Sequence, residues 1–272
     1  MLMMCHILDV SRSGYYRWRD RPLCARAQRR AELVEKIKEV QKHSRGTYGS
    51  PRVTAELNEA EVAVCENTVA RYMRESGIGV KPRRRFVPQT TDSDHDCPIA
   101  PNLLNQDFSA AAPDQKWACD LTYIWTDEGW LYLSVVIDLF SRRIIGWSMS
   151  DHLRGEGVAQ ALSMALARRR PGEGLLHHSD RGVQYACELY RAVLEKHGIT
   201  RSMSRSGNCY DNAVVESFFG TLKSELVHRE RYRTREQATS SVFEWIECWY
   251  NRRRRHSSLD YLSPEAFEAR VN

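Results

Sequence analysis

Three acidic residues in the second half of the chain have the types and the spacing of a metal-binding catalytic site. Asp120 interrupts the strand-like run KWACDLTYIW, and Asp180 ends a short apolar run that begins at Leu175. Glu216 lies on a segment with helical periodicity, and 35 residues separate it from Asp180. A carboxylate in or just after a buried strand is costly unless it has a partner. Carboxylate oxygens are the ligands that hard divalent cations prefer, so these residues predict an all-oxygen metal site.

The segment that carries Glu216 is predicted to be an amphipathic helix. Its apolar residues recur at three- and four-residue spacing and form one core-facing stripe: Val215, Phe218, Phe219, Leu222 and Leu226. Glu216 and Lys223 share an adjacent face, since positions seven apart nearly overlap on a helix. We expect Asp211 to be the N-cap of this helix, after a loop rich in Ser and Gly. The alternative is that Glu216 and Lys223 are only solvated charges on a surface helix.

The elements around the acidic residues predict a mixed α/β sheet. The expected strands are 117–125, 131–139, 144–150, 175–179 and 199–203, and the expected helices between them are 154–169 and 184–197. The first three strands are joined by tight turns, which is typical of an antiparallel meander. We therefore expect five strands in a mixed sheet, with Asp120 on the first strand and Asp180 after the fourth. Asp138 ends the second strand and is either a further metal ligand or a turn residue.

The charge of the chain is distributed unevenly. Residues 1–90 contain 18 Lys and Arg against 10 Asp and Glu, whereas residues 91–272 contain 22 against 25. A basic module joined to a mildly acidic one is a pattern that favours nucleic-acid binding at one end and cation binding at the other. Surface solvation is the alternative explanation of this bias.

The basic part is predicted to be a small all-helical module. Its helices are expected at 27–46, at about 52–59 and from the cap Asn67 to Met73. Pro51 suits the first turn of the second helix, and Gly77 suits the end of the third. Glu61 stands in a turn where glycine would be expected.

Clusters of arginine are the candidates for contact with DNA. They are Arg71 and Arg74 on the third predicted helix, Arg83, Arg84 and Arg85 directly after it, and Arg252, Arg253, Arg254 and Arg255 near the end of the sequence. Neutralising phosphates requires only a high density of positive charge, so each cluster could serve. A solvated protein surface is the alternative for each of them.

Three blocks of sequence resemble one known family. The blocks HHSDRGVQY, SMSRSGNCYDNAVVESFFGTLKSEL and YNRRRRHSSLDYLSPEAF are similar to the catalytic subunit (OrfB) of bacterial insertion sequences of the IS-three group. That group belongs to the Asp-Asp-Glu transposase and retroviral integrase superfamily, and the resemblance covers nearly the whole chain. It implies a ribonuclease H-like catalytic core after a helix–turn–helix module. It also implies a DNA transposase whose catalytic and metal-binding residues are Asp120, Asp180 and Glu216.

The resemblance also implies a mechanism and partners. Two Mg²⁺ or Mn²⁺ ions would support cleavage at the ends of the element and transfer of the resulting 3′-hydroxyl into DNA. Lys223 would contact a phosphate of the element end. From the sequence itself, His178 is expected either to orient Asp180 or to be a buried structural histidine, and Asn208, Tyr210 and Asn212 are expected to support the active site by shaping the loop over it. The expected partners are double-stranded DNA, further copies of the chain and an upstream-frame protein fused to it. A DNA-binding regulator with a decayed catalytic core is the alternative function.

The expected domains are a helical DNA-binding region at 1–85, a linker at 86–113, the catalytic core at 114–230 and a C-terminal helix with a basic tail at 231–272. No apolar run approaches the length of a membrane span, and no signal peptide is expected. The eight cysteines are scattered singly, which argues against a disulfide scaffold or a structural zinc site. These features suit a reducing cytosol, and the resemblance implies a bacterial cytoplasmic protein associated with the nucleoid.

Overall fold

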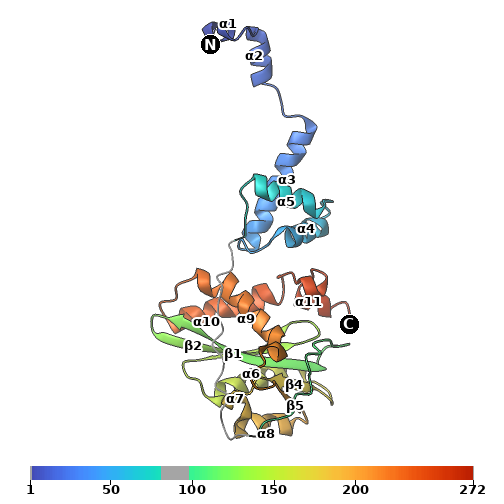
Figure 1. The fold of residues 1–272 in the computed structure, drawn as a ribbon, viewed down its shortest axis with the longest axis vertical. Coiled ribbons are helices and arrows are strands. Elements are labelled where there is room, and N and C mark those ends of the chain that lie inside the picture. Colours follow the sequence, from blue (N-terminus) through green and yellow to red (C-terminus); the bar gives the residue numbers. More distant parts are fainter. Residues whose placement is uncertain (1, 81–97, 272) are drawn as a thin grey trace. The chain divides into compact units, whose positions relative to one another are not determined.

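The chain folds as two units, and the computed structural model describes residues 2–80 and 98–271 (Figure 1). The first unit spans Met1–Lys81 and the second spans Pro82–Asn272. Among the helices of the described ranges, none combines the length and the apolar character needed to cross a membrane.

All regular elements within residues 2–80 are helices, as the sequence predicted. Two short helices, α1 (Leu2–Ile7) and α2 (Arg12–Arg19), precede α3 (Ala25–His43), α4 (Ser50–Glu59) and α5 (Glu66–Glu75). The last three helices pack against one another. Their shared core consists of Ile37, Tyr48, Val53, Leu57, Val69 and Met73. The helical module expected before the catalytic core is therefore present.

The turns of this unit follow the sequence signals with one exception. Pro51 lies in the first turn of α4, and Gly77 follows α5 with a φ of 65°. Glu61 has a φ of 59°, a left-handed conformation that favours glycine, so the turn has the geometry that its sequence position suggested. The prediction that Asn67 caps the third helix is wrong. The N-cap is Cys65, and α5 begins before Asn67.

The second unit is built on a five-stranded mixed sheet with the order β3-β2-β1-β4-β5. The strands are β1 (Lys116–Thr126), β2 (Gly129–Asp138), β3 (Ile144–Ser150), β4 (Leu176–Ser179) and β5 (Thr200–Met203). The first three form the predicted antiparallel meander, and β4 and β5 run parallel to β1. This arrangement confirms the predicted fold class.

Helices cover both faces of the sheet (Figure 1). On one face lie α6 (Gly155–Arg169), α7 (Val183–Ala186) and α8 (Glu188–Lys196). They enclose a core that includes Trp117, Val136, Leu162 and Tyr190. The other face carries α9 (Ala213–Glu225), which contacts β1, and α10 (Arg235–Glu244), which contacts β1 and β2. The acidic residues on β1 and α9 are therefore held by the layered core of the unit.

Two segments outside the sheet bond to its outer strands. The side-chain amide of Asn251 donates to the carbonyl of Ile144 and accepts from its N–H, both at 2.9 Å. At β5, the N–H groups of Leu103 and Leu104 donate to Ser202 Oγ at 2.9 and 3.1 Å. Residues 98–106 of the predicted linker thus lie against β5, while its residues 86–97 fall outside the described ranges.

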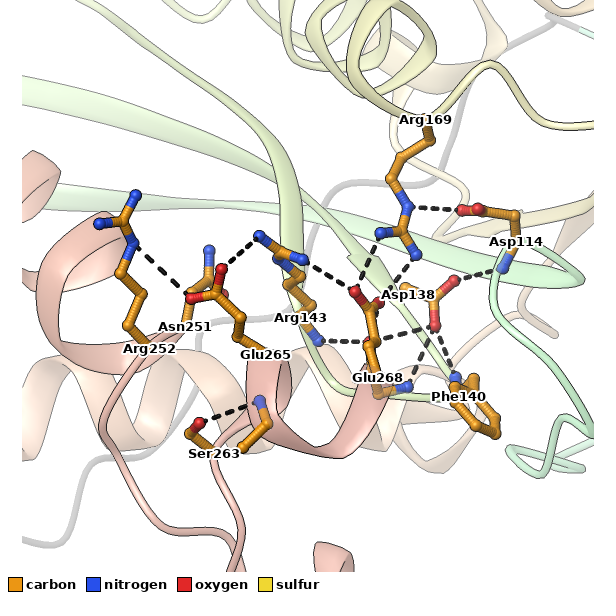
Figure 2. Close-up of polar contacts among 12 residues, drawn as sticks. Asp114, Asp138, Phe140, Arg143, Arg169, Asn251, Arg252, Ser263, Glu265 and Glu268 are labelled. Carbon is orange, nitrogen blue, oxygen red and sulfur yellow. Dashed lines mark hydrogen bonds and ion pairs between the residues drawn. The ribbon is translucent and has the colours of Figure 1, made fainter. Parts of the chain in front are cut away.

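The C-terminal segment is fastened to the sheet by charged side chains (Figure 2). After α10 the chain forms a π-helical turn (Trp245–Tyr250) and ends in α11 (Pro264–Glu268). Glu268 accepts hydrogen bonds from both terminal nitrogens of Arg169 at 2.7 and 3.0 Å, and from Arg143 at 2.8 Å. Arg169 belongs to α6 and Arg143 precedes β3, so one carboxylate joins three elements.

Asp138 acts as a turn residue at the end of β2. Its buried carboxylate accepts hydrogen bonds from the backbone N–H groups of Asp114, Phe140 and Ser141 at 2.7 to 3.1 Å (Figure 2). These bonds fix the turn into β3 and hold Asp114, two residues before β1. Of its two expected roles, the turn role agrees with these contacts.

Candidate active site

Asp120 lies on β1, and Asp180 directly follows the neighbouring strand β4. β1 and β4 are parallel, and Ala118 pairs with His178. Two residues further along, the same register brings Asp120 beside Asp180, with adjacent strands about 4.8 Å apart. Both side chains are partly buried. Burial, and then the negative charge of Asp180, raise the pKa of Asp120 well above its usual range.

Glu216 reaches this position from α9, which packs across β1. At the start of the helix, Asn212 Nδ2 donates to the carbonyl oxygen of Cys119 at 3.2 Å. Glu216 follows one helical turn later, and its charge also raises the pKa of Asp120, after burial and Asp180. The fold thus brings Asp120 and Asp180 together and holds Glu216 near enough for its charge to act on Asp120.

The three carboxylates do not form a closed coordination set. Within residues 2–80 and 98–271, no three Asp, Glu, His or Cys side chains are grouped closely enough to hold a metal ion. Glu216 is exposed, while Asp120 accepts a hydrogen bond from Leu121 N at 2.7 Å and Asp180 one from Gly182 N at 2.9 Å. The donor set nevertheless fits a hard divalent cation, because it is all oxygen and a cation would relieve the like-charge repulsion.

Lys223 occupies the same face of α9 two turns after Glu216. Its amine lies 4.9 Å from the ring centre of Tyr123 on β1, a cation–π arrangement. Burial lowers the pKa of Lys223, and the charge of Asp120 opposes that shift. The residue is 9% exposed, so it is not the freely solvated surface lysine of the alternative reading.

A buried network of uncharged groups lies under the acidic pair. Tyr190 Oη lies 3.4 Å from Cys119 Sγ and 2.5 Å from His177 Nε2. Burial raises the pKa of Cys119 and Tyr190, and burial with the neighbouring His178 lowers the pKa of His177 to about 3. These groups therefore stay neutral near pH 7 and leave the charge of the site to its carboxylates and Lys223.

His178 forms hydrogen bonds with two serines and also interacts with the charge of Asp211. Its Nδ1 lies 2.8 Å from Ser202 Oγ and its Nε2 lies 3.1 Å from Ser204 Oγ. Burial lowers the pKa of His178 to about 4. Both ring nitrogens are thus engaged by β5 and the residue that follows it, so His178 ties β4 to the start of the loop before α9.

Asp211 holds that loop together, a role that the sequence interpretation missed. Its buried carboxylate accepts from Arg205 Nη2 at 2.7 Å and from Gln106 Nε2 at 2.9 Å. The hydrogen bond from Arg205 holds the pKa of Asp211 well below its usual range. The prediction that Asp211 caps α9 is wrong, because a 3₁₀ turn (Cys209–Asn212) precedes the helix. Its complete burial demanded partners from outside the segment, which local periodicity cannot show.

The remaining loop residues are placed differently from one another. Asn208 caps the 3₁₀ turn by accepting from Tyr210 N at 3.1 Å. The Tyr210 side chain is 72% exposed. Asn212, in contrast, is buried and joins the helix start to β1. Asn208 and Asn212 therefore shape the entry to α9, while Tyr210 faces solvent.

The arginine run near the end of the chain divides into two pairs. Arg252 and Arg253 are exposed. Arg254 forms a buried ion pair with Glu225 at 2.7 Å, and Arg255 Nη1 donates to the carbonyl of Tyr261 at 2.8 Å. We therefore withdraw Arg254 and Arg255 from the candidates for DNA contact, because their guanidinium groups are buried in the protein.

Two candidates for DNA contact lie on α5 of the first unit. Arg71 and Arg74 are exposed, and the Arg71 guanidinium lies 5.0 Å from the ring centre of Tyr72. Arg83, Arg84 and Arg85 fall outside the described residues. Of these five arginines, Arg71 and Arg74 are the ones within the described residues, and both are exposed.

Comparisons with known proteins cover most of the chain. A family model described as "Integrase core domain" matches residues 110–209, and a second model with that description matches 197–264. A model described as "HTH-like domain" matches residues 28–86.

Two curated relatives match nearly the whole chain. The insertion element IS600 uncharacterized 31 kDa protein of Shigella sonnei is 45% identical over 269 residues, which is 99% of this chain and 98% of the relative. Transposase InsF for insertion sequence IS3A of Escherichia coli (strain K12) is 46% identical over 267 residues, which is 97% of this chain and 92% of the relative.

A solved structure has the same fold at low identity. A chain of the simian T-cell lymphotropic virus intasome, determined by cryoEM in complex with PP2A regulatory subunit B56 gamma, matches with a TM-score of 0.51 and 13% identity. The match covers 85% of this chain and 74% of that chain.

Proposed function

The chain belongs to the insertion-sequence transposases that include InsF of IS3 and is a DNA transposase with an integrase core, and we propose that Asp120, Asp180 and Glu216 are its catalytic carboxylates. The observation that supports this assignment is the register of β1 and β4, which brings Asp120 beside Asp180. The contact of Asn212 with Cys119 then directs α9 and Glu216 to the same end of the site.

The three carboxylates would hold Mg²⁺ or Mn²⁺, as two ions. Bound ions would supply Lewis acidity at the phosphate and at the attacking and leaving oxygens. Asp120 and Asp180 are oriented by the N–H groups of Leu121 and Gly182. Glu216 is exposed on its helix, so we propose that it joins the other two when DNA and the cations bind.

The reaction consists of two successive phosphoryl transfers. In the first, water attacks a phosphodiester at the element end, and the bond to the 3′ oxygen breaks to leave a 3′-hydroxyl. In the second, that hydroxyl attacks a phosphodiester of the other DNA, and the new bond forms as the old P–O bond breaks. Lys223 would stabilise a phosphate of the element end beside the carboxylates, because its amine lies within the electrostatic reach of Asp120.

DNA binding is indicated by the HTH-like and integrase regions. We propose Arg71 and Arg74 on α5, and Arg252 and Arg253 in the C-terminal segment, as contacts to the phosphate backbone. Arg83, Arg84 and Arg85 remain candidates from sequence. Assembly of several copies on DNA, fusion to an upstream-frame protein and a place at the bacterial nucleoid are further parts of the proposal.

The substitution Glu216→Gln tests the assignment. The variant keeps the size of the side chain and removes its charge, so binding to a duplex copied from the DNA that flanks the gene should persist. Cleavage of that duplex in Mg²⁺ should fall by more than the roughly 10–100-fold typical of losing a group that only supports a metal ligand. Glu195→Gln, on the exposed surface of α8, is the matched control. Cleavage retained by Glu216→Gln would disprove the role of Glu216, and binding without cleavage by the wild type would favour a regulator.

A further inference from the structure

A cavity of about 290 Å³ opens beside Lys223, further along β1 than Asp120. Its walls include Tyr123, Trp125, Trp130, Lys223, His228 and Arg231. Asp127 N donates to the carbonyl of Tyr232 at 3.0 Å, which links the β1–β2 hairpin to the segment on the other side of the cavity. The space is therefore built into the fold of the second unit.

Two tryptophans at this cavity are unusually exposed for their size. Trp125 is 57% exposed and Trp130 is 41% exposed, although large aromatic side chains are normally buried to a high degree. Their ring centres are 4.8 Å apart with an interplanar angle of 76°, and Tyr123 packs against Trp130 in the same way at 4.9 Å. Edge-to-face packing fixes the rings and leaves ring surface available to a further flat group.

Charges of both signs line the cavity, the positive ones on Lys223 and Arg231 and the negative ones on Asp127 and Glu230. The Lys223 amine lies over the ring of Tyr123, and the Arg231 side chain is 85% exposed with a contact of 3.3 Å to Asp127. His228 is exposed at the same wall. An occupant that suits these surroundings has a flat ring for the tryptophans and a negative charge for Lys223 or Arg231. A nucleotide has both.

The cavity lies further along the strand that carries Asp120, and Lys223 is the residue of its lining that interacts with Asp120. Tyr123 is three residues and Trp125 five residues beyond Asp120 on β1, or about 10 and 16 Å along an extended strand. Lys223 lies between the two places, since its amine contacts the ring of Tyr123 and interacts with the charge of Asp120. A DNA strand whose phosphate is at the carboxylates therefore reaches the tryptophans within a few nucleotides.

We propose that Trp125 and Trp130 form a stacking platform for one unpaired base of the reacting DNA end, displaced from its duplex while Lys223 contacts the backbone. The inference rests on the proposed function, because it places DNA at Asp120 and Asp180. Stacking on aromatic rings tolerates any base sequence, because every base presents a flat π face. The platform thus holds the DNA end open without reading its sequence.

The test uses the full-length protein and duplexes copied from the DNA that flanks the gene. One set is fully paired, and a second carries a single mismatch at successive positions next to the cleavage site. The double variant Trp125→Ala, Trp130→Ala should cleave the paired duplex about five- to a hundredfold more slowly, the range expected for loss of one base–aromatic stack. A mismatch at the displaced position should restore most of the rate, because that base no longer has to be unpaired.

Two control variants show whether slower cleavage is caused by the loss of aromatic rings at the cavity. Trp125→Phe, Trp130→Phe keeps aromatic rings and should cleave the paired duplex at a rate near that of the wild type. Phe243→Ala removes an exposed aromatic side chain of α10 that is not part of the cavity, and it should have no effect. Circular dichroism and thermal unfolding of the alanine variant check that it is folded.

Equal loss of cleavage on paired and mismatched duplexes would overturn the proposal, as would a normal rate on both. A change in oligomeric state with DNA cleavage unaffected would also overturn it and would indicate a protein interface at the tryptophans. Failure of the wild type to cleave any duplex in Mg²⁺ would instead refute the proposed function. The two failures are therefore distinguishable.

Discussion

Glu225 and Arg254 form a bidentate ion pair in the interior of the second unit, with Arg254 Nη2 2.7 Å from Glu225 Oε1 and Nε 2.9 Å from Oε2. Their side chains are 8% and 4% exposed. Glu225 is the last residue of α9, the helix that carries Glu216. The C-terminal segment therefore anchors the end of this helix.

Arg254→Ala should lower the free energy of unfolding by about 3–5 kcal/mol, because it leaves the Glu225 carboxylate buried without its partner. Arg254→Lys should also be destabilising, since an ammonium group cannot reproduce the two parallel hydrogen bonds. Urea unfolding measures both effects. Arg253→Ala is the matched control from the same run, and its exposed side chain predicts a change within about 0.5 kcal/mol. Equal effects of the two alanine substitutions would contradict the structural role of Arg254.

Glu61→Gly should raise the stability of the first unit. Glu61 has a φ of 59°, and a left-handed conformation costs a residue other than glycine about 1–2 kcal/mol. Part of that gain is offset by the greater freedom of glycine in the unfolded chain, so we expect a net gain below about 1 kcal/mol. Glu39→Gly, within α3, should instead cost about 1 kcal/mol. Thermal unfolding compares the two variants. A loss of stability in Glu61→Gly would show that the Glu61 side chain stabilises the fold by more than its left-handed backbone conformation costs.

Stability should fall as the pH drops below about 6.5. His177 and His178 have their pKa values lowered to about 3 and about 4 in the folded protein, chiefly by burial. The unfolded chain therefore binds protons that the folded chain does not, and each histidine contributes about 1.4 kcal/mol of lost stability per pH unit between about 6.5 and its folded pKa.

The variant His177→Gln isolates this effect. Asp120 opposes the trend in the wild type, because its raised pKa means that the folded form takes up a proton more readily than the unfolded chain. Urea unfolding at pH 7.5 and 5.5 should give a smaller difference for His177→Gln than for the wild type. The same difference in both proteins would mean that the pKa of His177 is not lowered in the folded protein.

Asp120→Asn should stabilise the metal-free protein and abolish its response to Mg²⁺. Removing one of two neighbouring negative charges relieves repulsion in a partly buried site, which we expect to be worth about 1 kcal/mol. In the wild type, Mg²⁺ at ten times its dissociation constant should add about 1.4 kcal/mol. Thermal unfolding with and without Mg²⁺ gives both values. Asp151→Asn, exposed before α6, should behave as the wild type, and a Mg²⁺ response retained by Asp120→Asn would place the cation elsewhere.

The strands and most helices could be predicted because their signals are local. The apolar run around Asp120 and the periodicity of 213–225 each depend on neighbouring residues, and both elements form where expected. Asp211 shows the limit of such signals. Its position before a helix indicates a cap, but Arg205 of the same loop and Gln106, which is 105 residues away, bind it instead.

Arg254 and Arg255 show a second limit. Four consecutive arginines suggest an exposed surface, yet the π-helical turn at Trp245–Tyr250 precedes them. A π-helical turn adds a residue to the ordinary helical repeat and so changes which later positions face the core. The 3.6-residue periodicity of the sequence does not reveal this change in the core-facing positions. The buried partner Glu225 also lies 29 residues away from Arg254.

The bonds that Asn251 and residues 101–104 make to the outer strands affect how copies of the protein can meet. An outer strand with free N–H and C=O groups is a template for pairing with another chain, and it can start aggregation. Here the Asn251 amide occupies both backbone groups of Ile144, and the carbonyl of Pro101 accepts from Met203 N on β5. These contacts occupy part of each outer strand and leave less free backbone there for strand pairing with another chain.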